Sequence, residues 1–205
     1  MIALSNFLIA FVLSFAGSIP PGTINLTVVQ LGLENKVKTA IRFAFTAALI
    51  EYPYAWIAVK FERLISSSPV ITDNIQIIGI IMLIGLGLVN VLPSKNITPK
   101  YLKRFSNSGY RRGVFQGILN PLAIPYWIAV TAYLRGQNWI ELSTTVRLHA
   151  YLAGVFAGAL LLLVALAYLS KSVMSQMSQY PFMRKVPGFL LISLGLYSLG
   201  EYLLH

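Results

Sequence analysis

The stretch Ser18-Ile19-Pro20-Pro21-Gly22 interrupts the first long hydrophobic segment of the chain, and Asn120-Pro121, followed by Pro125, interrupts a later one. Proline inside an apolar helix removes an amide donor and clashes with the preceding turn. Lipid offers no water to satisfy the carbonyls that such a break frees, so these breaks survive only beside protein or a wet cavity. Two breaks at corresponding places of two halves are typical of transporters that bind cargo between discontinuous helices near the bilayer midplane.

The composition indicates a polytopic membrane protein. Hydrophobic residues make up 57% of the 205 residues and charged residues 11%, whereas soluble globular chains carry about 25% charged residues. The chain has no cysteine, which excludes disulfides, thiolate metal sites and cysteine nucleophiles. We predict no cofactor and no bound metal, and we expect the whole chain, residues 1–205, to form one transmembrane domain.

Six segments approach the roughly 20 apolar residues that a helix needs to cross the bilayer core. The first, Ile2 to Leu33, is too long for one straight span and is predicted as two helical pieces joined at the proline cluster. The others are predicted at Thr39 to Val59, Ile75 to Leu92, Gly113 to Leu134, Ala150 to Ser170 and Val186 to Gly200. The predicted fold class is an all-α membrane protein with six transmembrane helices, of which helices 1 and 4 are broken.

The order of these segments predicts an inverted 3+3 repeat. Each half opens with a broken span, and similar strings close the two halves, Leu83-Ile84-Gly85-Leu86-Gly87-Leu88 and Leu191-Ile192-Ser193-Leu194-Gly195-Leu196. Because each half has three spans, the second half enters the membrane from the opposite side. We place repeat 1 at about 1–92, an inner loop at about 93–112 and repeat 2 at about 113–205.

The distribution of basic residues predicts the sidedness. Twelve of the 16 lysines and arginines lie in the first, third and fifth connectors. Positive charge in short connectors marks the cytoplasmic side, so both termini are expected outside. The net charge is +10, but bases clustered beside apolar spans are interpreted as topological anchors, and no nucleic-acid partner is expected. The expected partners are the lipid bilayer and a small-molecule substrate, and a homodimer is left open.

Glu51 is the only acidic residue well inside a predicted span, where an uncompensated carboxylate is strongly disfavoured. Small residues share its helical face, and such faces let helices approach closely, so this face should look inward at other spans. They are Ala44, Ala47, Ala48, Ala55 and Ala58. Glu51 is therefore the candidate substrate-binding and proton-coupling residue. The alternative is that Glu51 pairs with a buried hydroxyl or amide and only locks the bundle.

The two breaks offer further polar groups without charged side chains. Ser18 and Asn120 are predicted N-caps of the second half-helix at each break, and the exposed amides of helix N-termini attract anions. Thr27 and Gln30 share a face with Thr23 and either extend a polar path or bond back to their own helix. The substrate-binding residues that we predict at the breaks are Pro20, Pro21, Gly22, Thr23, Asn120 and Pro121.

Two further expectations concern packing. Gly154 and Gly158 belong to a small-residue face on the fifth span, for which a helix-packing role is expected. Most aromatic residues near the predicted site are expected in belts at the membrane interface. These aromatic residues are Tyr52, Tyr54, Trp56, Tyr126, Trp127 and Tyr133.

Taken together, these residues resemble the lysine exporter (LysE) and homoserine/threonine exporter (RhtB) translocator family. The first span of that family carries Pro-Gly-Pro, where this chain has Pro21-Gly22-Thr23 preceded by Pro20. Its fourth span carries Asn-Pro-Lys, where this chain has Asn120-Pro121-Leu122. The glycine-rich closing span, Gly188 to Gly195, is also similar. The resemblance covers nearly the whole chain and implies a bacterial inner-membrane exporter of amino acids or related small molecules, driven by an ion or proton gradient.

We expect a zwitterionic substrate to place its carboxylate on half-helix amides and its ammonium near Glu51. Substrate and proton would then compete for one carboxylate, and export would be antiport. An enzyme is not expected, because the chain has no His-Glu-x-x-His pattern and no pair of intramembrane aspartates. Two alternatives stay open. One is an exporter of metal ions or other cations, for which one buried carboxylate offers few ligands, and the other is a membrane scaffold without cargo.

Overall fold

The structure is a computed structural model that describes residues 1–19, 22–66, 108–120, 123–179 and 186–204, together with positions 77, 80, 81, 84, 85, 87, 88 and 91. Within these parts of the chain, all regular structure is helical, as predicted. Most of the predicted third span, Ile75 to Leu92, lies outside the described residues. The same holds for part of the string Leu83 to Leu88, so the sequence repeat is not tested there.

Both predicted breaks separate two helices. Helix α1 (Ile2–Ser18) and helix α2 (Thr23–Leu33) meet at an angle of 75°. Helix α7 (Gly109–Ile118) and helix α8 (Ala123–Gly136) meet at 63°. Four residues separate the two helices at each break, 19–22 at the first and 119–122 at the second. The prediction that each of these apolar stretches is two helical pieces is confirmed.

The unbroken helices are longer than the apolar runs that predicted them. Helix α3 (Val37–Ser66) passes through Pro53 without ending, and helix α9 (Thr145–Gln179) extends beyond Ser170. Helix α10 (Val186–Leu204) lies near its predicted position. The extensions carry charged residues such as Lys60 and Lys171. A hydropathy criterion ends a predicted span at such residues, but lysine has a high helix propensity and the helix continues through it.

By length and composition, one described helical stretch, Thr145–Ser172 of α9, suffices to cross a bilayer. Each bent pair adds one more if its two halves form a single span, which gives up to three among the residues that the structure describes. The total of six spans stays a prediction.

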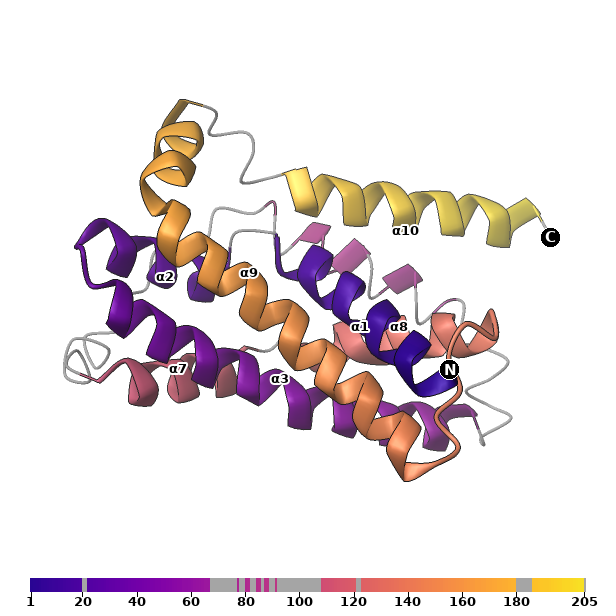
Figure 1. The fold of residues 1–205 in the computed structure, drawn as a ribbon. Coiled ribbons are helices and arrows are strands. Elements are labelled where there is room, and N and C mark those ends of the chain that lie inside the picture. The colour runs from indigo at the N-terminus through magenta and orange to yellow at the C-terminus, as the bar shows by residue number, and fades with distance from the viewer. Residues whose placement is uncertain are drawn as a thin grey trace.

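Helix α9 occupies the middle of the molecule and contacts α1, α2 and α3 (Figure 1). Two glycines allow the close approach of α1. A Cβ atom at Gly158 would lie 2.9 Å from the backbone nitrogen of Phe15, and one at Gly154 would lie 3.0 Å from the Cβ of Ala10. The packing role expected for Gly154 and Gly158 is therefore confirmed, and backbone contact replaces side-chain interdigitation at this crossing.

Helix α7 packs on α3 in a similar way (Figure 1). Gly109, Gly113 and Gly117 follow one another at four-residue spacing and face α3. A Cβ at Gly113 would lie 2.5 Å from the carbonyl oxygen of Phe43, and one at Gly117 would lie 2.9 Å from the Cβ of Ile50. Each broken span thus lays its first half on an unbroken helix through a row of glycines.

We predict that Gly158→Leu destabilises the protein by about 1–3 kcal/mol, because the added side chain would overpack the crossing of α1 and α9. The matched control is Gly200→Leu on α10, where a Cβ would meet nothing within 4 Å. Thermal unfolding of both detergent-purified variants measures the difference. Equal melting temperatures for the two variants would contradict this packing.

Candidate functional site

Glu51 lies on α3 and faces the second broken span. Its Oε2 accepts a hydrogen bond from Trp127 Nε1 at 2.9 Å, and its Oε1 accepts one from Asn120 Nδ2 at 3.4 Å. An ionised carboxylate only accepts hydrogen bonds, and both partners donate, so the protein supplies the compensation that burial requires. The small face around Glu51 also points inward as predicted. Its members, Ala44, Ala47, Ala48, Ala55 and Ala58, are at most 2% exposed.

Each break leaves a carbonyl at the end of its first half-helix, and a side chain from another element satisfies it. The carbonyl of Ser18, which ends α1, accepts a hydrogen bond from Asn25 Nδ2 of α2 at 2.6 Å. The carbonyl of Ile118, which ends α7, accepts one from Tyr54 Oη of α3 at 2.6 Å. The two breaks are therefore held by the same device, a side-chain donor on the last carbonyl.

The predicted N-caps are wrong. Ser18 ends α1 and does not precede α2, whose N-cap is Gly22 with an extended backbone and no capping side chain. Asn120 lies three residues before α8 begins, and its amide donates to Glu51. The physical reason is that four residues separate the half-helices at each break, so the residue that ends one helix is not the residue that starts the next.

Several predicted binding residues are not close to Glu51. Gly22 and Thr23 are exposed at the start of α2, a side chain at Gly22 would meet open space, and neither residue bonds to Glu51. Pro20, Pro21 and Pro121 lie outside the described residues. Of the predicted set, the structure brings together Glu51 and Asn120.

Tyr126 connects the two broken spans. Its hydroxyl donates a hydrogen bond to the carbonyl of Leu13 in α1 at 3.0 Å. A Cβ at Gly17 would lie 2.6 Å from Cζ of the same ring, so the glycine makes room for it. The next residue, Trp127, stacks edge to face on Tyr126 with ring centroids 5.1 Å apart and donates to Glu51. Tyr126 and Trp127 therefore connect the first broken span, the second broken span and the carboxylate of Glu51.

The expected interfacial belt is wrong for Trp127, which is 2% exposed and packs edge to face on the fully buried Tyr151. The hydroxyl groups of Tyr126 and Tyr54 also donate hydrogen bonds to helix carbonyls. Trp56 and Tyr133 are exposed, as belt residues are. One feature of the sequence could have indicated that Trp127 lies near the site. Trp127 follows Pro121 of the second break by six residues and lies on the same helix as Pro125.

The polar path proposed below the first break does not form. The Thr27 hydroxyl donates to the carbonyl of Thr23 at 2.8 Å, one turn earlier in its own helix. Gln30 donates to Glu34, which also pairs with Lys36 in the exposed turn after α2. Hydrogen bonds from Lys36 and then Gln30 hold the pKa of Glu34 below its usual range. Thr27 therefore follows the alternative in which hydroxyls bond back to their own helix.

One buried carboxylate was missed. Glu62 lies in α3 beyond the predicted end of the span at Val59, is 3% exposed and forms an ion pair with Arg135 of α8. Hydropathy assigned Glu62 to a connector because Lys60 and Arg63 flank it. Helix α3 runs on past the predicted end of the span, so Glu62 shares a helix with Glu51.

Among the residues that the structure describes, no group of three or more histidine, aspartate or glutamate side chains is placed to hold a metal ion. A family model described as LysE type translocator matches residues 15–201 and confirms the resemblance drawn from the two breaks. Comparisons with curated proteins and with solved structures gave no match.

We predict that Gly17→Ala destabilises the protein by about 1–3 kcal/mol, since the new methyl group collides with the ring of Tyr126. In a Tyr126→Ala background the same change should be close to neutral, because the space is then free. A double-mutant cycle on thermal unfolding would give a coupling of about 1 kcal/mol or more if α1 and α8 meet here. Additive effects of the two substitutions would contradict the contact.

Proposed function

The chain belongs to the LysE type translocator family, and we propose that it is a secondary active exporter of amino acids or related small molecules in the bacterial inner membrane. Family membership makes it a membrane-embedded transport protein. The observation that carries the proposal further is the position of Glu51, a half-buried carboxylate held by two donors of the second broken span. Intramembrane carboxylates beside broken helices are the usual place of substrate and proton sites.

Substrate recognition follows from the charges available. The ammonium group of a zwitterionic amino acid is attracted to the Glu51 carboxylate, and Trp127 and Tyr126 offer ring faces beside it. The substrate carboxylate needs donors within a few bonds of the ammonium group. The first amides of α8, the helix whose Trp127 bonds to Glu51, are the donors that we propose, and Pro121 precedes that half-helix.

Proton coupling is proposed at the same group. When Glu51 is ionised, it accepts from Asn120 and Trp127 and attracts an ammonium group. When it is protonated, the attraction is lost and the carboxyl group can donate a hydrogen bond instead. Substrate and proton therefore exclude one another at Glu51, and a cycle in which each replaces the other is antiport.

The packing of the helices supports an inverted 3+3 repeat. If α1, α2 and α3 correspond to α7, α8 and α9, then the contact of α1 with α9 corresponds to that of α7 with α3. The contact of α2 with α9 corresponds likewise to that of α8 with α3. Each broken span packs on the unbroken helix of the other half. We propose on this basis that the chain is one domain with repeat 1 at about 1–92 and repeat 2 at about 113–205.

We predict that Glu51→Gln abolishes proton-coupled efflux, because glutamine keeps the shape but can neither ionise nor carry a proton. Proteoliposomes loaded in turn with radiolabelled amino acids and with metal ions, under an imposed pH gradient, measure efflux and internal pH together. Glu34→Gln, which removes an exposed carboxylate in the turn after α2, is the control and should transport normally. Unchanged efflux in the Glu51 variant would remove this residue from the mechanism.

The proposed topology puts both termini outside the cell, with the turn between α2 and α3 inside and the start of α9 outside. Because the chain has no cysteine, single cysteines report on sidedness. Val146→Cys should react with a membrane-impermeant maleimide in intact cells, and Lys36→Cys should react only in inverted vesicles. The reverse pattern would overturn the orientation.

A further inference from the structure

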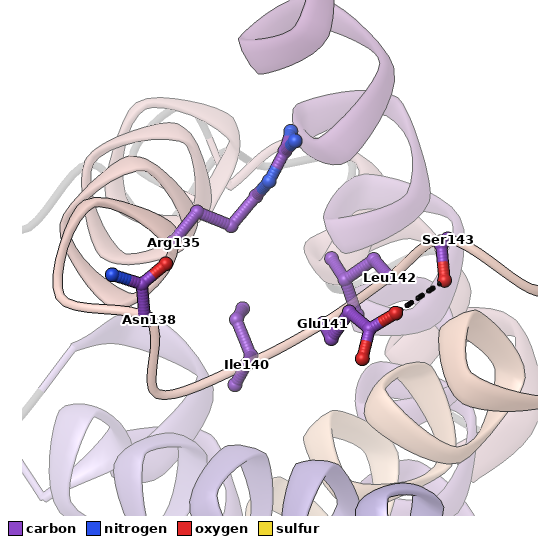
Figure 2. A pocket seen from close by; sticks show the side chains of 6 residues that line it. All are labelled: Arg135, Asn138, Ile140, Glu141, Leu142 and Ser143. Carbon is purple, nitrogen blue, oxygen red and sulfur yellow. Dashed lines mark hydrogen bonds between the residues drawn. The ribbon is translucent and has the colours of Figure 1, made fainter.

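The geometry points to a second ligand site, separate from Glu51, that binds a zwitterionic amino acid at the end of the bundle where α8 leads into α9. A pocket of about 410 Å³ lies there, lined by Arg135, Asn138, Ile140, Glu141, Leu142 and Ser143 (Figure 2). This volume is within the range of about 300–1,000 Å³ that small-molecule sites occupy. Arg135 follows Trp127 by eight residues, so the pocket is removed from the Glu51 site by roughly 12 Å along α8.

The pocket carries one charge of each sign. Figure 2 shows Arg135 and Asn138 toward one side of it and Glu141 with Ser143 toward the other. A free amino acid carries a carboxylate and an ammonium group a few bonds apart, and each has a charged counterpart here. Charge-assisted hydrogen bonds of this kind are the strong ones, and a guanidinium suits a carboxylate in particular.

Both charged side chains keep hydrogen-bonding capacity beyond their pairs within the protein. Arg135 pairs with Glu62 through Nη1, and a guanidinium has five N–H donors in total. The Oε1 atom of Glu141 accepts from Ser143 Oγ at 2.7 Å and from Arg147 Nη1, whereas its Oε2 accepts no hydrogen bond from the residues described. The existing partners hold the two groups in place without saturating them.

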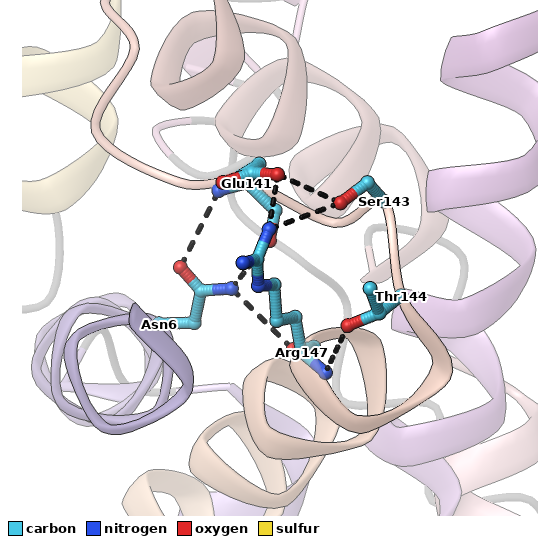
Figure 3. A network of polar contacts seen from close by, with 5 residues as sticks. All are labelled: Asn6, Glu141, Ser143, Thr144 and Arg147. Carbon is cyan, nitrogen blue, oxygen red and sulfur yellow. Dashed lines mark hydrogen bonds and ion pairs between the residues drawn. The ribbon is translucent and has the colours of Figure 1, made fainter. Parts of the chain in front are cut away.

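The rest of the pocket is held by packing and by hydrogen bonds, and such preorganisation limits the entropy lost on binding. Ile140 and Leu142 are buried in the same apolar cluster as Trp127 and form a fixed apolar surface. Asn6 of α1 anchors the loop from the other side: its Nδ2 donates to the carbonyl of Glu141 at 2.8 Å, and its Oδ1 accepts from the Glu141 amide at 3.4 Å (Figure 3). A built pocket with two opposite charges therefore faces solvent at this end.

This inference rests on the proposed function for its ligand and for its sidedness, since the proposed topology places the 137–144 loop outside the cell. The site would then hold amino acid on the side where export releases it. Occupancy does not require transport, so the two proposals can fail separately.

The test uses Ser143→Cys, a nearly isosteric change that puts a thiol in the pocket of an otherwise cysteine-free chain. Labelling by a membrane-impermeant maleimide is followed in right-side-out vesicles with and without millimolar L-alanine or L-leucine. We expect either amino acid to slow labelling several-fold, and the methyl esters and N-acetyl derivatives, which lack one charge, not to protect. Val146→Cys, 71% exposed and outside the pocket, should show no protection.

Further variants separate this site from the central one. Protection of Ser143→Cys should persist with Glu51→Gln, and it should be lost with Glu141→Gln and weakened with Arg135→Lys, each checked for folding by thermal unfolding. Absence of protection by both amino acids, equal protection by the singly charged analogues, loss of protection with Glu51→Gln, or labelling only in inverted vesicles would each overturn the inference. An unchanged efflux in Glu51→Gln would refute the central mechanism and leave this site standing.

Discussion

Unsatisfied backbone groups are the constraint on which this structure depends, because a broken helix in an apolar chain has no water at hand to bond its free carbonyls. The last carbonyl of α1 is bonded by Asn25, and the last carbonyl of α7 is bonded by Tyr54. Tyr126 bonds a further carbonyl of α1, at Leu13. These donors stabilise the breaks, and two of them, Tyr54 and Tyr126, come from the helices that also carry Glu51 and Trp127.

Close packing brings those donors within reach. Glycines on α7 and α9 let α3 and α1 approach at backbone distance, and this proximity fixes where the side chains of α3 and α8 meet. Glu51 consequently faces the second break and not an open surface. A carboxylate at this point contacts the second discontinuous helix through Trp127, whose neighbour Tyr126 bonds to the first.

The sequence predicted the features that depend on residues close together in the chain. Proline clusters gave the two breaks, and helical periodicity gave the inward alanine face with Glu51 on it. Features that depend on contacts between distant residues were missed. The burial of Trp127 depends on Tyr151, which local sequence does not reveal. The charges beside Glu62 assigned it to a connector, and the partner that compensates its burial, Arg135, lies 73 positions away. The N-caps were wrong because the pattern of polar residues does not give the number of residues between two half-helices, which is four at each break.

The crossed arrangement of the helices has a consequence for biogenesis. Helix α1 leaves the ribosome first, but the surface on which it packs belongs to α9, which begins at Thr145. At about 5–20 residues per second, roughly 6–25 s of synthesis separate the two. During that interval the first bent segment is in the membrane without its partner helix. The insertion machinery or lipid headgroups must therefore cover its unpaired surface until α9 is made. Neither half is expected to assemble by itself, although both halves made as separate polypeptides hold all the complementary surfaces.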